Sequence, residues 1–141
     1  ISNLRFNENG EAVALLDLDT LGYLSLDIEL GDAFRSWCNP AAEDTEETAF
    51  DMPLFEASVR GYLASRALNL EERSALPGGV ERICLELSSR FAADAINESY
   101  FGWNPDVAPG RGEHSLLRAK GQFCLAQSVC AQRSKMDRVL A

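Results

Sequence analysis

The stretch "NLRFNENGEAVALLDLD", residues 3–19, decides how the chain begins to fold. Two short apolar runs flank a turn that contains Asn9 and Gly10, and Asn-Gly in this position is the strongest short signal for a β-hairpin. The second run ends in Asp17 and Asp19, which a strand places on one face because its side chains alternate with a period of two. Two like charges at this spacing repel, so either the strand ends in solvent there or a cation lies between them. Carboxylate oxygens are ligands that suit Mg²⁺.

After the hairpin, apolar residues recur at helical spacing. The pattern predicts helices over 28–38 and 51–67, a helix that begins after Asn69, and a last helix from Ser115 to about Val139. The run Pro77-Gly78-Gly79 is expected to interrupt the third of these helices. The predicted fold class is therefore α+β and mostly α. We expect one domain over 1–141, with a hairpin over 1–20 and a helical part over 28–141.

The overall charge limits the classes of partner. The 141 residues carry a formal net charge of −9, with a pI of about 4.5. An acidic surface disfavours nucleic acid or an anionic membrane as the main partner, and no apolar run approaches the length of a membrane span. The four cysteines form no CxxC pair and the only histidine is His114, so a zinc site is not expected. Three of the four cysteines lie in helical patterns on apolar faces, where they are expected to be buried thiols, and we expect a reducing, cytoplasmic setting.

One longer segment supports a family resemblance. Residues 3–39, "NLRFNENGEAVALLDLDTLGYLSLDIELGDAFRSWCN", resemble the aminoglycoside phosphotransferase and choline-kinase-like superfamily, especially its sugar-kinase-like members. In that superfamily a catalytic loop HxDxKxxN leads into a hairpin that ends in an I-D-x-D/E motif, and a helix with the sequence D-L-G-D-A-L-R follows. Asn3 stands at the last position of the loop, Asp17 at the motif aspartate, and "ELGDAFR" (29–35) at the start of the helix. Glu29 replaces the usual aspartate.

The resemblance implies an activity. The superfamily transfers the γ-phosphoryl group of ATP to a hydroxyl of a small molecule, here a sugar or an aminoglycoside, on a two-lobed protein-kinase-like fold. Asn3 and Asp17 would be ligands of the Mg²⁺ that bridges the nucleotide phosphates, and Asp19 a second or outer contact. The catalytic aspartate would lie before Ile1, so we expect the chain to be a fragment of the C-terminal helical lobe that is inactive alone, within a parent enzyme. The alternative is a non-catalytic binding or scaffold domain that keeps the kinase-like helices.

Other side chains are weaker candidates for the site. The resemblance implies that Asp32, with Arg35 three residues on, braces the catalytic loop, whereas an ordinary surface pair would explain the same spacing. Tyr100, Phe101 and Trp103 lie in a loop rich in Gly and Pro, where they could form an aromatic wall for a sugar ring or simply pack into the core. Arg118 is a further candidate for binding the substrate beside these aromatic residues.

Two polar features have plainer expectations. His114 is expected at the surface or at a helix cap, and the acidic run Glu43–Glu47 is expected to be a solvated loop. A chain that lacks the other lobe would also expose apolar surface and could self-associate.

Overall fold

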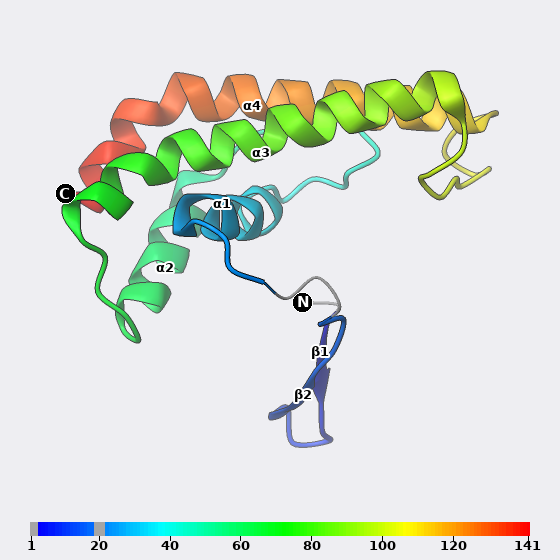
Figure 1. Ribbon diagram of the computed structural model, residues 1–141. Coiled ribbons are helices and arrows are strands. Elements are labelled where there is room, and N and C mark those ends of the chain that lie inside the picture. Colours follow the sequence, from blue (N-terminus) through cyan, green and yellow to red (C-terminus); the bar gives the residue numbers. More distant parts are fainter. Residues whose placement is uncertain (1–2, 19–21) are drawn as a thin grey trace.

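The computed structural model describes residues 3–18 and 22–141, so the predicted metal contact Asp19 lies outside the described residues. Within them, an antiparallel hairpin precedes four helices (Figure 1). The predicted fold class, α+β and mostly α, is confirmed. The strands are β1 (Leu4–Phe6) and β2 (Ala12–Leu15), and the helices are α1 (Leu26–Trp37), α2 (Met52–Leu63), α3 (Leu70–Asn97) and α4 (Arg111–Leu140).

The hairpin forms around the predicted Asn-Gly turn. Gly10 has a φ of +79°, a conformation that glycine adopts without steric cost, and its N–H donates to the Asn7 carbonyl at 3.0 Å. The strands pair Leu4 with Leu15. Among the described residues neither strand packs on a helix, and the hairpin extends away from the helical body (Figure 1). Its apolar side chains are consequently exposed: Phe6, Val13, Leu15, Leu16 and Leu18.

Helices α2 and α3 begin at side-chain caps. The N–H of Leu54 donates to Asp51 Oδ1 at 2.8 Å. At α3 the N–H of Glu72 donates to Asn69 Oδ1 at 2.8 Å, and the N–H of Asn69 donates to Glu72 Oε2 at 2.9 Å, which is a complete capping box. These caps satisfy backbone donors that have no partner within the helix.

The predicted interruption at Pro77-Gly78-Gly79 is wrong, because α3 is continuous from Leu70 to Asn97 with Pro77 inside it. Proline removes one backbone hydrogen bond, but the buried packing of α3 against α1 and α4 maintains the helix. The glycine at 79 serves this packing. A Cβ on Gly79 would collide with the Asp27 carbonyl oxygen, so its absence lets α1 cross α3 closely.

The buried face of α4 changes in character along the helix. Leu116 and Phe123 do not belong to it and are about half exposed, at 47% and 50%. The residues that pack inward are small or polar in the first half of α4 and largely apolar in the second half: first Gly112, His114, Ser115, Ala119, Gly121 and Gln122, then Leu125, Ala126, Val129, Met136 and Leu140. Small side chains let two long helices approach closely, and α3 with α4 forms the most extensive helix pair.

Two cysteines are buried, where the sequence predicted three. Cys38 and Cys84 are buried, whereas Cys124 is half-buried and Cys130 is exposed. Within the described residues no helix is both long enough and apolar enough to cross a membrane.

Candidate functional site

Asn3 and Asp17 meet at the open end of the hairpin. The Asn3 Nδ2 donates to Asp17 Oδ2 at 3.2 Å, and the backbone N–H of Leu16 donates to the Asn3 carbonyl at 2.8 Å. Asp17 has a φ of 62°, in the left-handed region that non-glycine residues seldom occupy. Such backbone outliers concentrate at functional sites, where the surrounding structure supports their cost. The hairpin thus brings together the two residues that the sequence singled out.

A large cavity of about 830 Å³ lies beside this pair, between the hairpin, α1, α3 and the loop that connects α3 with α4. Its apolar lining comes largely from leucines of the hairpin and from α3. The polar side chains on its wall, besides Asn3 and Asp17, are Glu29, Asp32, Arg35, Glu43, Glu86 and Arg90. Carboxylates outnumber guanidinium groups on this wall, so the cavity can offer many hydrogen-bond acceptors to a polar ligand.

Asp32 and Arg35 both line the cavity and pair with each other. Arg35 Nε lies 3.0 Å from Asp32 Oδ1, and Arg35 Nη1 lies 3.6 Å from Glu43 Oε1. Arg35 is the more buried partner and connects α1 to the acidic run. The proposed bracing of a catalytic loop by Asp32 stays a prediction.

The acidic run is a loop in which Glu46 and Glu47 are exposed, as expected, but the expectation of solvation is wrong at Asp44, whose side chain is only 26% exposed. Residues 43–48, here called the acidic segment, lie along α4. Arg118 Nε donates to Asp44 Oδ1 at 2.6 Å, and Lys120 Nζ donates to Glu46 Oε1 at 3.0 Å. Basic side chains on α4 thus neutralise carboxylates that the sequence pattern alone assigns to solvent.

Gly121 lets the acidic segment approach the backbone of α4. A Cβ at this position would collide with the Thr45 carbonyl oxygen. The Thr48 hydroxyl donates to the Gly121 carbonyl at 2.9 Å, which anchors the segment further. A sequence pattern cannot distinguish this glycine from one that merely weakens a helix.

His114 is fully buried, so its expected place at the surface is wrong. Its Nδ1 accepts a hydrogen bond from the Asn104 N–H at 3.2 Å. Nε2 lies 2.9 Å from Asp44 Oδ1, although the N–H is not aligned well enough for a hydrogen bond. Burial alone would raise the pKa of the Asp44 carboxyl, but the Arg118 hydrogen bond and the nearby His114 outweigh it and lower that pKa.

Asp94, near the end of α3, organises the start of the loop that follows. Its carboxylate accepts from the backbone N–H groups of Tyr100 at 2.7 Å, Ser99 at 3.0 Å and Phe101 at 3.2 Å, and from the Ser115 hydroxyl at 3.0 Å. The Tyr100 hydrogen bond, helped by the others and opposed by burial, lowers the pKa of this carboxyl. Sequence reasoning missed Asp94, because an acidic residue in a helix gives no sign that it will bond backbone groups of the next loop.

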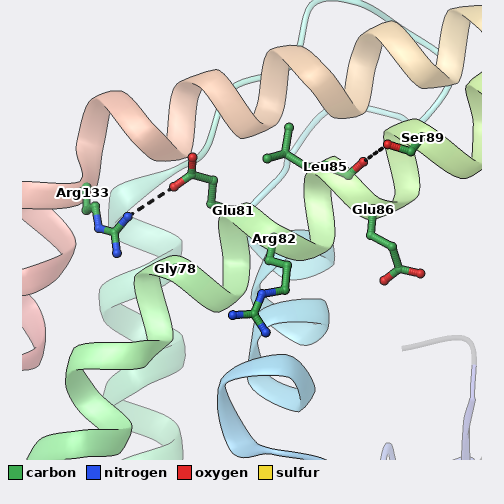
Figure 2. Close-up of a pocket in the computed structure, with 7 residues that line it drawn as sticks. All are labelled: Gly78, Glu81, Arg82, Leu85, Glu86, Ser89 and Arg133. Atoms are coloured by element: carbon green, nitrogen blue, oxygen red, sulfur yellow. Dashed lines mark hydrogen bonds and ion pairs between the residues drawn. The ribbon is translucent and has the colours of Figure 1, made fainter.

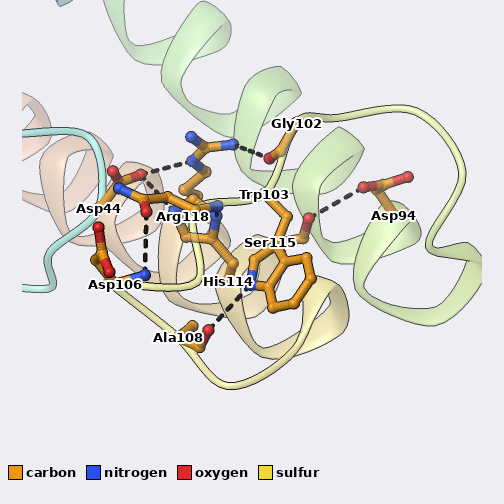
Figure 3. A network of polar contacts seen from close by, with 10 residues as sticks. Asp44, Asp94, Gly102, Trp103, Asp106, Ala108, His114, Ser115 and Arg118 are labelled. Carbon is orange, nitrogen blue, oxygen red and sulfur yellow. Dashed lines mark hydrogen bonds and ion pairs between the residues drawn. The ribbon is translucent and has the colours of Figure 1, made fainter.

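Of the three residues of the predicted aromatic wall, only Phe101 lines the large cavity. Trp103 is 41% exposed and its Nε1 donates to the Ala108 carbonyl at 2.9 Å, while Tyr100 lies next to Arg90. Arg118 is held in the polar network of Figure 3. Substrate binding by Tyr100, Trp103 and Arg118 stays a prediction.

A smaller cavity of about 410 Å³ is lined by residues of α3 between Gly78 and Ser89 and by Arg133 of α4 (Figure 2). Several of its polar side chains have partners within the cavity wall. Arg133 Nη1 lies 3.4 Å from Glu81 Oε2, and the Ser89 hydroxyl donates to the Leu85 carbonyl at 2.8 Å. This cavity shares Glu86 with the larger one but contains none of the predicted site residues.

The described residues contain no group of three or more histidines, cysteines or acidic residues that could hold a metal ion. Asn3 and Asp17 nevertheless fit Mg²⁺ in their chemistry, since both carry hard oxygen donors. Mg²⁺ in nucleotide sites is commonly bound by one or two protein side chains together with phosphate oxygens and water.

No protein-family model matches the sequence.

Proposed function

We propose that the chain is part of an ATP-dependent small-molecule kinase, in which Asn3 and Asp17 bind the Mg²⁺ of the nucleotide. The observation that carries the proposal is the 3.2 Å hydrogen bond between these two side chains at the edge of the 830 Å³ cavity. Their sequence positions match the last asparagine of a catalytic loop and the aspartate of an I-D-x-D/E motif in the phosphotransferase superfamily that the chain resembles.

The backbone of Asp17 supports a ligand role. The left-handed conformation turns the chain sharply at the end of β2, so that the carboxylate faces Asn3. When bound, Mg²⁺ would supply charge neutralisation at the phosphates, which is a large part of catalysis in phosphoryl transfer. Asn3 and Asp17 would hold and orient it.

The cavity is the proposed acceptor site. Its wall combines carboxylates with Arg35 and Arg90, a composition that suits a hydroxyl-rich acceptor such as a sugar or an aminoglycoside. Binding of nucleotide with Mg²⁺ tests the role proposed for Asn3 and Asp17 directly.

The test is a calorimetric titration of the chain with ATP in the presence of Mg²⁺ and again with EDTA. We expect binding that requires Mg²⁺ and that weakens by about tenfold or more in Asp17→Asn, since one charge-assisted contact contributes roughly 1.5–3 kcal/mol. Asparagine tolerates the left-handed backbone, so this variant removes charge without adding strain. Asp137→Asn, at an exposed position on α4, is the matched control.

Two results would count against the proposal. Equal affinity for ATP with Mg²⁺ and with EDTA would show that Asp17 does not bind the nucleotide through Mg²⁺. Equal affinity of Asp17→Asn and the wild type for MgATP would contradict the same role. A folded chain that binds no nucleotide would favour the alternative, a non-catalytic binding or scaffold domain.

A further inference from the structure

We propose that Asp44 is a positioning residue of the large cavity. Through Arg118 its carboxylate ties the acidic segment to the loop 98–110, which connects α3 with α4. The tie fixes the spacing between Glu43 and Phe101, which lie on the cavity wall. The inference rests on the proposed function only in taking this cavity as the acceptor site.

A single guanidinium group connects the two segments (Figure 3). Arg118 Nε donates to Asp44 Oδ1 at 2.6 Å, and Arg118 Nη1 donates to the Gly102 carbonyl at 3.0 Å. Glu43 directly precedes Asp44, and Phe101 directly precedes Gly102. The residues held by Arg118 are therefore chain neighbours of the residues that line the cavity.

Partial burial strengthens this connection. The side chains of Arg118 and Asp44 are 18% and 26% exposed. Charge-assisted hydrogen bonds are roughly twice as strong as neutral ones, and screening by solvent is reduced where the groups are partly buried. The Arg118 guanidinium also lies 5.5 Å from the centre of the Phe91 ring, another part of the cavity wall.

His114 is also in contact with the Asp44 carboxylate. It lies 2.9 Å from Asp44 through Nε2 and holds the Asn104 N–H through Nδ1. Two backbone groups of the loop, at Gly102 and Asn104, are thus held by side chains that converge on Asp44. Asp94 holds residues 99–101 independently. Loss of the Asp44 charge should therefore release Glu43 with the acidic segment, and also the part of the loop around Trp103. Phe101 should stay in place, so the spacing between Glu43 and Phe101 should change.

Trp103 provides a direct reporter of this loop. The chain has two tryptophans, so Trp37→Phe leaves Trp103 as the only one. In that background we would compare Asp44→Asn, which keeps the side-chain size and removes the charge, with Glu47→Gln. Glu47 lies exposed in the same acidic segment, so Glu47→Gln removes the same charge next to the proposed tie.

At pH 7 we expect Asp44→Asn to shift the Trp103 emission to longer wavelength and to increase its quenching by acrylamide, with an unchanged far-ultraviolet helix signal. Glu47→Gln should match the background protein. On acidification the background protein should undergo the same shift below the ordinary carboxyl range, because Arg118 and His114, the charged and titratable partners that face Asp44, hold its pKa low. In Asp44→Asn the shift should already be present at pH 7.

Unchanged Trp103 emission in Asp44→Asn would overturn the proposal. If Asp44→Asn fails to fold, Arg118→Lys is the second variant, because a single ammonium group cannot reach both Asp44 and Gly102. If Asp44→Asn and Arg118→Lys both show the emission shift and lose the far-ultraviolet helix signal, Asp44 stabilises the fold as a whole and is not a positioning residue. MgATP affinity measured on the same samples tests the proposed function separately, since the Trp103 result does not depend on it.

Discussion

A Cβ added to Gly31 would lie 2.8 Å from the carbonyl carbon of Gly79, so α1 and α3 cross with backbone against backbone. Real side-chain atoms do not approach a backbone carbon this closely, and the two helices would have to move apart. This crossing places the cavity-lining residues of α1 opposite those of α3.

The first prediction follows from that crossing. Gly31→Ala should lower the free energy of unfolding by about 1–3 kcal/mol, the usual cost of overpacking in a close-packed interior. Urea denaturation followed by circular dichroism measures it. The control is Gly61→Ala in α2, where a Cβ would meet no atom within 4 Å. The free energy of unfolding of that variant should rise by roughly 0.5–1 kcal/mol, because alanine has a higher helix propensity than glycine. Equal stability of Gly31→Ala and the wild type would contradict the close crossing.

Thiol reactivity should divide the four cysteines. Burial, opposed by a hydrogen bond with Ser58, raises the pKa of Cys38 to about 11, and burial raises the pKa of Cys84 to about 12. Their thiolate forms are therefore scarce at neutral pH, and we expect neither to react with a disulfide reagent such as DTNB in the folded chain. Cys130 is exposed and should react first. Mass spectrometry of the labelled peptides identifies the sites, and the same labelling in guanidinium chloride should reach all four cysteines.

Acid should weaken the loop that Asp94 organises. The pKa of Asp94 in the folded chain lies below its unfolded value of about 3.9. Its stabilising contribution is therefore complete above that value and is lost as the pH falls through the lower folded pKa. Asp94→Asn should thus lower Tm by a constant amount at pH 6–8, and the difference from the wild type should shrink below about pH 4. Asp137→Asn serves as the control, and a difference that does not change with pH would argue against an ionised Asp94.

Self-association through the hairpin is a prediction that sedimentation velocity can check. A two-stranded hairpin is marginally stable by itself, and this one exposes an apolar face. We expect the chain to associate with rising concentration, and Val13→Ser combined with Leu15→Ser to reduce that association. Ile96→Ser, at an exposed apolar position on α3, should not. A wild-type chain that stays monomeric throughout would contradict the expectation.

Local patterns in the sequence predicted several elements correctly. The Asn-Gly turn and the beginning of a helix after Asn69 depend on residues within a few positions of one another, and both appear as predicted. The meeting of Asn3 with Asp17 also follows from the hairpin, because its register fixes which residues face each other at the open end.

The sequence by itself therefore determined the fold class, the hairpin and the pairing of Asn3 with Asp17, since short-range geometry specifies all of these. Only the tertiary structure decided that α3 continues through Pro77, that His114 is buried, and that the acidic segment lies on α4. Each depends on groups distant in the chain: the close approach of α1, the carboxylate of Asp44, and the basic side chains of α4. Proline usually ends a helix, and a histidine or an acidic run is usually exposed. A long-range contact overrides such a preference when the contact stabilises the fold by more free energy than is lost by going against the preference.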